Sequence, residues 1–312
     1  MRLPGGTDDA AHLSGTTVQE PPVHKSRESA GKKARGCTCG YMPCAALVLA
    51  IELCRMISIG TSGFSFRDWM GVFYPEGTRP GNYLSYYTQF FKTVEINTTY
   101  YAVPKPSVFE NMLEKTPGDF EFMVKANKAT THEMADGDIA ESFLETLGPL
   151  RDSGRLSGIL SQFPWRFRND VDSRKYLAGM SKRYRDLPVF VEFRHNSWNC
   201  EEVYAFLKSI GLLFVSVDEP QIGDMMPPVA RATGDVGYVR FHGRNSATWW
   251  GKSGDRYDYN YSEEELEEWI GKVEELEKTV WKLYAFFNNC HQGYAVRNAL
   301  LFKDMLEKRK RT

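Results

Sequence analysis

The amino-acid sequence predicts an α/β protein, a single (β/α)8 barrel of the TIM type with a disordered N-terminal extension. Strand-like runs alternate with helical runs from Met56 onward, which indicates a parallel sheet with helical connections. Eight such units fit into residues 56–312, close to the about 250 residues of a typical barrel. An open doubly wound sheet is the alternative, but the sequence has neither its GxGxxG after the first strand nor a GxxxxGK phosphate loop.

The strand-like runs are rich in β-branched and aromatic residues, with apolar residues at alternate positions. The first run, ISIGTSG, sets Ile57 and Ile59 against small polar residues. Each later run repeats this alternation. The eight predicted strands are 57–63, 93–101, 120–127, 156–164, 188–195, 212–219, 236–243 and 282–289.

Between the strands, apolar residues recur every three or four positions, the spacing of a helix that packs one face on a sheet. Each strand is therefore expected to be followed by a helix. The acidic run EEELEEWIGKVEELE is interpreted as the solvated face of one of them. The clearest predicted helices are 82–91, 106–115, 139–150, 201–210, 262–278 and 294–308.

Strand parity also predicts which side chains enter the barrel, because alternate residues face opposite sides of a sheet. In the fifth strand Val191 and Phe193 share one face, and Glu192 lies on the other. Every strand has an apolar face of this kind and a second face that turns polar toward its C-terminal end. The predicted polar residues at the upper end of the barrel axis are Glu95, Asn97, Lys125, Gln162, Glu192, Arg194, Asp218, Arg240, His242 and Asn288.

Barrel enzymes build their active sites at this end, so these residues form a candidate site. The alternative is an internal salt-bridge network that fills the barrel and binds nothing. Burying such polarity is costly, which favours a ligand site. The candidate catalytic residues are Glu95, Glu192 and Asp218 as general bases, with His242 or His132 as proton donor. The candidate substrate-binding residues are Asn97, Lys125, Gln162, Arg194, Arg240, Arg244 and Asn288.

The predicted ligand is a small anion, phosphorylated and sugar-like or nucleotide-like, and the protein is expected to bind it or to act on it. The long loop after the seventh strand places Trp249 and Trp250 beside Arg244, a combination that suits a ring and a phosphate. The cofactor is left open. A divalent metal held by Glu192, Asp218 and His242 ranks lower, because neighbouring arginines would repel a cation.

Composition limits the function classes. The 39 Lys and Arg residues against 40 Asp and Glu leave a formal net charge of -1, so there is no bulk attraction to nucleic acid or membrane. No apolar run approaches the about 18 residues of a membrane span. Unpaired Cys200 and Cys290 fit a cytoplasmic setting. The alternative function is a non-catalytic nucleic-acid or protein-binding module that uses an arginine and aromatic rim, and the oligomeric state is left open.

Residues 1–55 are rich in Gly, Ser, Thr, Pro and charge without any periodicity, and are predicted to be disordered. Met56 stands directly before the first strand, so one hypothesis is that translation begins there. The cluster of Cys37, Cys39 and Cys44 has the spacing of a zinc or iron-sulfur site. No second CxxC or His pair follows, so a metal is not favoured.

Eight motifs together resemble those of the domain of unknown function 72 family, the YecE-like proteins. They run in order over about residues 57–305, and the extension has no counterpart in the family. The resemblance implies a TIM-barrel-like fold and no established activity. The motifs are GTSGFSFRDWMGVFYP, VEINTTYYAVP, FMVKANKATTH, SQFPWRF, VEFRHNSW, YVRFHGRN, RYDYNYSEEEL and FFNNCHQGYAVRNA.

Overall fold

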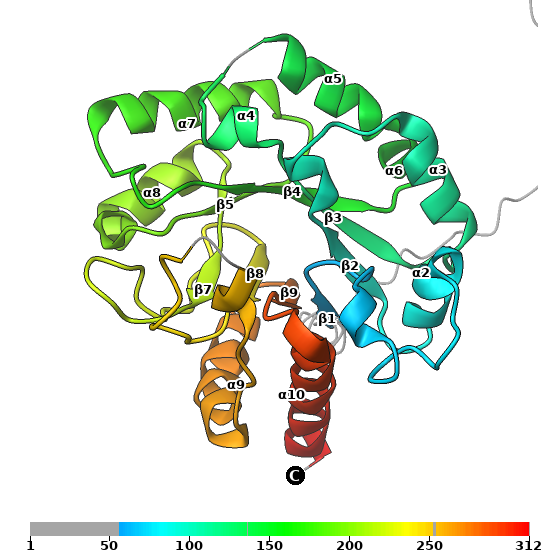
Figure 1. Cartoon of the computed structure of the whole chain (residues 1–312). Coiled ribbons are helices and arrows are strands. Elements are labelled where there is room, and N and C mark those ends of the chain that lie inside the picture. Colours follow the sequence, from blue (N-terminus) through cyan, green and yellow to red (C-terminus); the bar gives the residue numbers. More distant parts are fainter. Residues whose placement is uncertain (1–55, 136, 252–253, 312) are drawn as a thin grey trace, which may run out of the picture. The chain divides into compact units, whose positions relative to one another are not determined.

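The computed structural model describes residues 56–135, 137–251 and 254–311, which form helices around parallel strands (Figure 1). The predicted extension, residues 1–55, lies outside the described residues together with its cysteine cluster. Met56, the possible start of translation, is the first residue of the first strand. The parallel α/β architecture is confirmed. Within the described ranges, no helix is long and apolar enough to cross a membrane.

All eight predicted strands are present, and the sixth is divided at Val215 into two short parts. Apart from the sixth strand, their alternating apolar residues pack against the helices, as the sequence predicts. The strands are β1 (Met56–Thr61), β2 (Thr93–Ile96), β3 (Glu121–Lys125), β4 (Leu156–Gln162), β5 (Val189–Glu192), β6 (Leu213–Phe214), β7 (Ser216–Asp218), β8 (Val236–Phe241) and β9 (Lys282–Phe287).

The six predicted helices are found, one of them divided where a new helix begins at Gly148, with Pro149 in its first turn. Two further helices follow β3 and β4. The α-helices are α2 (Tyr83–Tyr87), α3 (Pro106–Glu114), α4 (Lys128–Thr131), α5 (Asp138–Thr146), α6 (Gly148–Asp152), α7 (Val171–Arg183), α8 (Glu201–Ser209), α9 (Glu263–Glu277) and α10 (Tyr294–Arg311). The 3-10 turns are η1 (Arg67–Trp69), η2 (Pro80–Asn82), η3 (Thr98–Tyr100), η4 (Asn196–Trp198), η5 (Gly254–Tyr257) and η6 (His291–Gly293).

The expectation that every strand is followed by a helix is wrong for the sixth strand. Residues 219–235 connect β7 to β8 without helix. Pro220, Pro227 and Pro228 lie in this connection, and each lacks the amide proton that a helix interior needs. The outer side of β7 is therefore not covered by a helix of its own unit.

The strands form two parallel sheets, ordered β2-β3-β4-β5-β6 and β7-β8-β9-β1. One continuous segment, 213–218, contains both β6 and β7 and so leads from the first sheet to the second. On the other side, the backbones of β1 and β2 are joined in the described residues only by an isolated bridge between Ser62, which follows β1, and Glu95. The predicted closed barrel is thus open along most of the β1/β2 seam.

The hydroxyl of Tyr87, on α2, stands in this seam where a closed barrel would have a ladder hydrogen bond. It accepts the amide proton of Thr61 over 2.9 Å and donates to the carbonyl oxygen of Thr93 over 3.1 Å. The backbones are also close at Gly60, where a Cβ would lie 2.5 Å from the Thr93 oxygen. Tyr87 therefore links β1 to β2 through a side chain.

We expect Tyr87→Phe to lower the free energy of unfolding by about 1–2 kcal/mol, because it leaves a buried amide and a buried carbonyl without their partner. Urea unfolding would measure the loss. Tyr86→Phe is the matched control, since no hydrogen bond from its hydroxyl is seen among the described residues. Equal stability of the two variants would mean that Tyr87 does not hold the seam.

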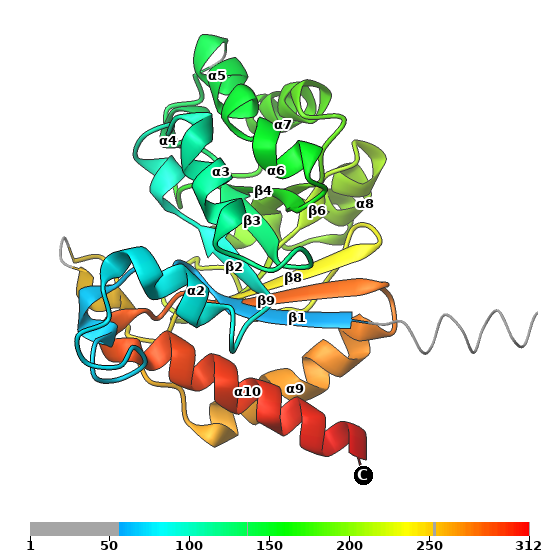
Figure 2. The same cartoon turned by 90° about the vertical axis from the view of Figure 1, so that its right-hand side faces the viewer.

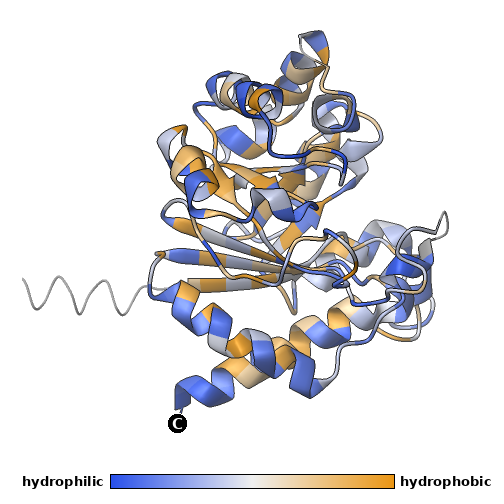
Figure 3. Ribbon diagram, turned by 90° about the vertical axis from the view of Figure 1, so that its left-hand side faces the viewer, coloured by the Kyte–Doolittle hydropathy of each residue, from blue (hydrophilic) through white to orange (hydrophobic). Residues whose placement is uncertain are grey.

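Helices cover both outer sides of the strands. Figure 2 shows α9 and α10 on one side of β1, β9 and β8, with α3 to α8 on the other side of the molecule. Hydrophobic residues gather on the strands and on the helix faces turned toward them (Figure 3). Phe241 of β8, for example, packs with its ring centroid 5.4 Å from that of Trp269 on α9. The other face of β8 is thereby turned toward the barrel interior.

Candidate functional site

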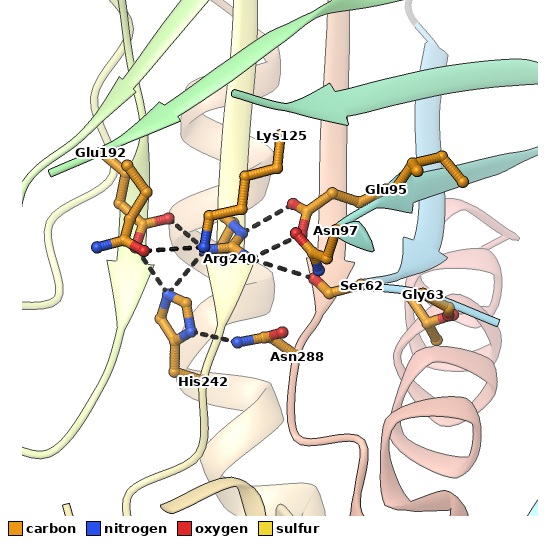
Figure 4. Close-up of polar contacts among 12 residues, drawn as sticks. Ser62, Gly63, Glu95, Asn97, Lys125, Glu192, Arg240, His242 and Asn288 are labelled. Atoms are coloured by element: carbon orange, nitrogen blue, oxygen red, sulfur yellow. Dashed lines mark hydrogen bonds and ion pairs between the residues drawn. The ribbon is translucent and has the colours of Figure 1, made fainter. Parts of the chain in front are cut away.

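Arg240, on the inner face of β8, is at the centre of a buried group of charges (Figure 4). Its Nε donates to Glu95 Oε2 over 2.8 Å and its Nη2 donates to Glu95 Oε1 over 2.7 Å, a bidentate pair. Its Nη1 donates to Glu192 Oε2 over 2.5 Å. The three side chains are at most 1% exposed. Arg240 thus ties β2 and β5 together through the barrel interior.

A second arginine, Arg194, follows β5 and holds the other oxygen of the same carboxylate. Its Nη2 lies 2.7 Å from Glu192 Oε1, and its Nη1 donates to Glu219. His242 Nε2 lies 3.2 Å from Glu192 Oε1. The Asn288 amide donates to His242 Nδ1 over 3.0 Å, which assigns the ring proton to Nε2.

Burial works against charge in this group, and the neighbours decide which groups stay charged. Burial alone would raise the pKa of Glu192, but Arg194 and Arg240 hold it well below its ordinary value. Burial, and then the charge of Arg194, lower the pKa of His242 well below its ordinary value. Glu192 is therefore a carboxylate and His242 a neutral imidazole at neutral pH.

Lys125, at the end of β3, is a third cation beside the two arginines. Its Nζ donates to Gln162 Oε1 over 2.9 Å and lies 4.5 Å from the centroid of the Tyr100 ring. Among the described residues, no carboxylate lies within ion-pair distance of this ammonium. Burial, and then the charge of Arg240, lower the pKa of Lys125 to about 7.

A cavity of about 1300 Å³ opens at the C-terminal ends of the strands. Its polar lining comes from strand ends and the turns that follow them, and its walls are largely aromatic. The polar lining includes Ser62, Asn97, His132, Gln162 and Asn288. The aromatic lining consists of Phe64, Phe66, Tyr100, Tyr101, Trp165, Trp249, Trp250 and Tyr257.

The charged side chains that line this cavity all carry the same sign. Within the described part of the chain they are Lys115, Lys125, Arg194 and Arg256, with no Asp or Glu among them. The carboxylates of the buried group lie behind the arginines that bind them. The surface offered to a ligand is therefore cationic, although the chain as a whole has a net charge of -1.

The structure divides the sequence-predicted site into two layers. Asn97, Lys125, Gln162, Arg194 and Asn288 line the cavity. The other layer is buried and is occupied by its own hydrogen bonds, as the contacts of Arg240 show. Its predicted members are Glu95, Glu192, Arg240 and His242. These four therefore support the cavity lining from behind.

Asp218 does not reach the barrel axis, and its predicted placement there is wrong. Its carboxylate accepts hydrogen bonds from Trp269 Nε1 over 2.6 Å and from the Tyr261 hydroxyl over 2.7 Å. Trp269 belongs to α9, so the side chain faces outward. The carboxylate that enters the interior at this point is Glu219, which receives the hydrogen bond from Arg194.

The missing helix after β7 explains why parity failed at this strand. An outer strand face is normally covered by apolar helix residues, so strand parity predicts that the polar face of the sixth strand, with Asp218, points to the interior. Here the backbone of Arg231 and the side chains of α9 give polar partners to Ser216 and Asp218 instead. Val217 is thus free to face inward. No local signal in the sequence distinguishes these two arrangements.

Arg244 also lies outside the cavity, contrary to its predicted role in substrate binding. Its Nη2 donates to Asp218 Oδ2 and to Glu268 Oε2, both over 2.8 Å. It lines a separate and smaller cavity of about 430 Å³ together with these two residues. Arg244 therefore fastens the loop after β8 to α9.

The ligand set considered for a divalent metal is not assembled, because Asp218 faces α9 while Glu192 and His242 face the interior. Over the ranges that the structure describes, no three His, Cys, Asp or Glu side chains are grouped so that they could hold a metal ion. Cys200 and Cys290 are free thiols. The cluster of Cys37, Cys39 and Cys44 lies outside the described residues.

Sequence comparison supports the resemblance seen in the motifs. The profile of the family described as "Protein of unknown function DUF72" matches residues 58–312. The UPF0759 protein YunF of Bacillus subtilis is 33% identical over 271 residues, covering 81% of this chain and 94% of that protein. The UPF0759 protein YecE of Escherichia coli is 34% identical over 98 residues, 30% of this chain and 34% of that protein.

Solved structures give the same result. A DUF72 family protein of Thermotoga maritima aligns with a TM-score of 0.76 and 45% identity, covering 81% of this chain and 99% of its own. A DUF72 family protein of Enterococcus faecalis aligns with a TM-score of 0.73 and 27% identity, covering 81% of this chain and 96% of its own.

Proposed function

Because the chain belongs to the DUF72 family of proteins of unknown function, we propose from its cavity alone that it binds a small anionic ligand that carries a ring. A phosphorylated sugar and a nucleotide are the two classes that fit. The ligand lies at the C-terminal mouth of the barrel, over Lys125 and Gln162.

The observation that carries this proposal is the sign of the charges around the cavity. Two of the four lining cations, Lys125 and Arg256, contact aromatic rings and neutral oxygens. Neither has a carboxylate in ion-pair contact within the described ranges, so their charges remain available to a ligand. An anion placed between them gains charge-assisted hydrogen bonds, which are stronger than neutral ones.

The aromatic walls support a ring in the ligand. Trp165 and Trp250 pack edge to face, with centroids 5.9 Å apart, and Trp250 is 62% exposed. Aromatic faces at an open mouth suit the apolar face of a sugar or a base. The indole nitrogen of Trp165 and Oδ1 of Asn97 are buried without a hydrogen-bond partner, so both are available to hydroxyl groups of a ligand.

Turnover of the ligand would depend on groups that reach it, which changes the assignment of catalytic residues. Arg240 occupies both oxygens of Glu95 and one oxygen of Glu192. We therefore assign proton transfer to Lys125 and His132, which line the cavity. Burial, and then the charge of Lys125, lower the pKa of His132 to about 4, so its imidazole is neutral at neutral pH.

The test is ligand-induced stabilisation of the full chain by glucose 6-phosphate, AMP and inorganic phosphate. A ligand at 100 times its Kd stabilises the native state by about 2.7 kcal/mol. Lys125→Gln and Arg256→Gln should each weaken binding by about tenfold or more, since each removes a charged contact. Arg151→Gln is the control, because Arg151 pairs with Asp152 outside the cavity and its side chain is 58% exposed.

The pH dependence adds a second readout. Lys125 loses its proton as the pH rises through about 7, so binding of the anion should weaken above that pH.

Absence of binding to all three compounds would contradict the proposal. Binding of a single-stranded oligonucleotide alone would favour the polymer-binding alternative. The outer helices do not favour that alternative, because Arg309 and Lys310 of α10 pair with Glu267 and Glu277 of α9.

A further inference from the structure

Lys125 has surroundings unlike those of the other cations in the barrel. Arg194 and Arg240 each bind two carboxylates, whereas the Lys125 ammonium has an amide oxygen and a ring face as neighbours. It lies at the end of β3 and lines the cavity of about 1300 Å³. A ligand in that cavity would therefore reach its Nζ directly.

The charges that face Lys125 come from three other strands. Glu95 on β2 and Glu192 on β5 favour its ammonium form, while Arg240 on β8 and Arg194 after β5 oppose it together with burial. Burial and Arg240 prevail, which lowers the pKa to about 7. In about half of the molecules, the Lys125 side chain is then a free amine at neutral pH. Desolvation beside another cation is a known way to activate a lysine as a nucleophile.

We propose that Lys125 is a nucleophile that forms an imine with an aldehyde or ketone carbonyl of the ligand. This inference rests on the proposed function and narrows its ligand to carbonyl compounds. The Nζ lone pair of the neutral amine attacks the carbonyl carbon, and one N–H proton of the amine is transferred to the carbonyl oxygen to give a carbinolamine. The carbinolamine then loses its hydroxyl together with the remaining N–H proton as water, leaving a neutral imine with a C=N bond, so that one water is released and no oxidant or reductant is used.

Two cavity-lining groups with exchangeable protons, Tyr100 and His132, lie near Lys125. Tyr100 lies under Nζ of Lys125, and the His132 ring centroid is 5.2 Å from that of Tyr100. His132 Nδ1 is engaged by the Thr131 hydroxyl over 3.0 Å, which leaves Nε2 for exchange. A protonated imine at this position carries the same single positive charge as the Lys125 ammonium.

The experiment is reductive trapping on the full chain. Pyridoxal 5′-phosphate, an aromatic aldehyde with a phosphate, serves as the probe, sodium borohydride reduces any imine, and peptide mass mapping locates it. At pH 7 we expect Lys125 to be labelled at least about tenfold faster than Lys128, which is half exposed and lies 3.6 Å from Glu133. The rate at Lys125 should reach its half-maximum near pH 7, whereas an ordinary lysine titrates near pH 10.4.

Lys125→Arg tests the adduct, and phosphate binding by the wild-type chain tests the proposed function separately. A guanidinium retains the positive charge but does not form an imine, so the adduct at this position should be lost in Lys125→Arg. Label spread evenly over exposed lysines of the wild-type chain, with phosphate binding intact, would overturn the inference alone. Absence of both the adduct and phosphate binding in the wild-type chain would overturn the proposed function as well.

Discussion

Arg240→Met should lower the free energy of unfolding by about 3–5 kcal/mol, the largest effect that we expect of a single substitution in this protein. The guanidinium makes two hydrogen bonds to Glu95 and one to Glu192, and both carboxylates are 0% exposed. Without it, carboxylate charge stays buried with fewer partners. Urea unfolding at pH 7 would measure the loss.

Arg151→Met is the matched control for this prediction. It removes an arginine from a pair in which both side chains are more than half exposed, and such pairs contribute less than about 1 kcal/mol. Adding Glu95→Gln and Glu192→Gln to Arg240→Met should recover part of the stability, because both side chains are then neutral and neither leaves a buried charge that has lost its arginine. A loss below about 1 kcal/mol in Arg240→Met would show that the buried group is not held by this arginine.

The pH dependence of the same variant follows from Glu192. Its pKa in the folded protein lies well below its ordinary value, so its contribution to stability is present above about pH 4.3 and is lost as the pH falls through the folded pKa. Removing Arg240 removes one cause of that lowering. The stability difference between the wild-type protein and Arg240→Met should therefore narrow as the pH falls below about 4.

Asp218→Asn should lower the free energy of unfolding by about 2–3 kcal/mol without removing ligand binding. Three donors converge on this carboxylate, from Trp269, Tyr261 and Arg244, and it is 1% exposed. An amide replaces one accepting oxygen by a donor, which leaves at least one of these groups without its bond. Urea unfolding and the phosphate-binding assay would be measured together.

Asp172→Asn is the control for this change, because the Asp172 side chain is 93% exposed in its contact with Lys175. We expect the affinity of Asp218→Asn for inorganic phosphate to stay within about threefold of the wild-type value. Unchanged stability with a tenfold loss of affinity would contradict the structural role and return Asp218 to the ligand site.

Much of the fold could be predicted from local patterns. The positions of all eight strands followed from the alternation of apolar and polar residues. The inward placement of Glu192 and Arg240 followed from the same parity. The closure of the barrel could not be predicted in this way. Whether β1 pairs with β2 depends on Tyr87, a residue of neither strand, whose hydroxyl occupies the seam.

The sequence predicted the end of the barrel at which the candidate site lies, but it did not predict the contacts that each of its residues makes. Parity placed Lys125 and Arg194 at the same end of the barrel without showing that Arg194 is bound by two carboxylates and Lys125 by none. Strand parity also placed Asp218 in the barrel interior, where the structure has Glu219. In both cases the deciding contact comes from a residue on another strand or helix, which the alternation of a single strand does not report.

By itself, the sequence determined the order of strands and helices, the family, and the end of the barrel at which polar residues gather. These properties depend on periodicity and on motifs that are local in the chain. Only the tertiary structure decided which charges neutralise one another, which side chains line the cavity, and that its charged lining is cationic. Those properties depend on distances between residues far apart in sequence, because a buried charge is governed by the atoms that surround it.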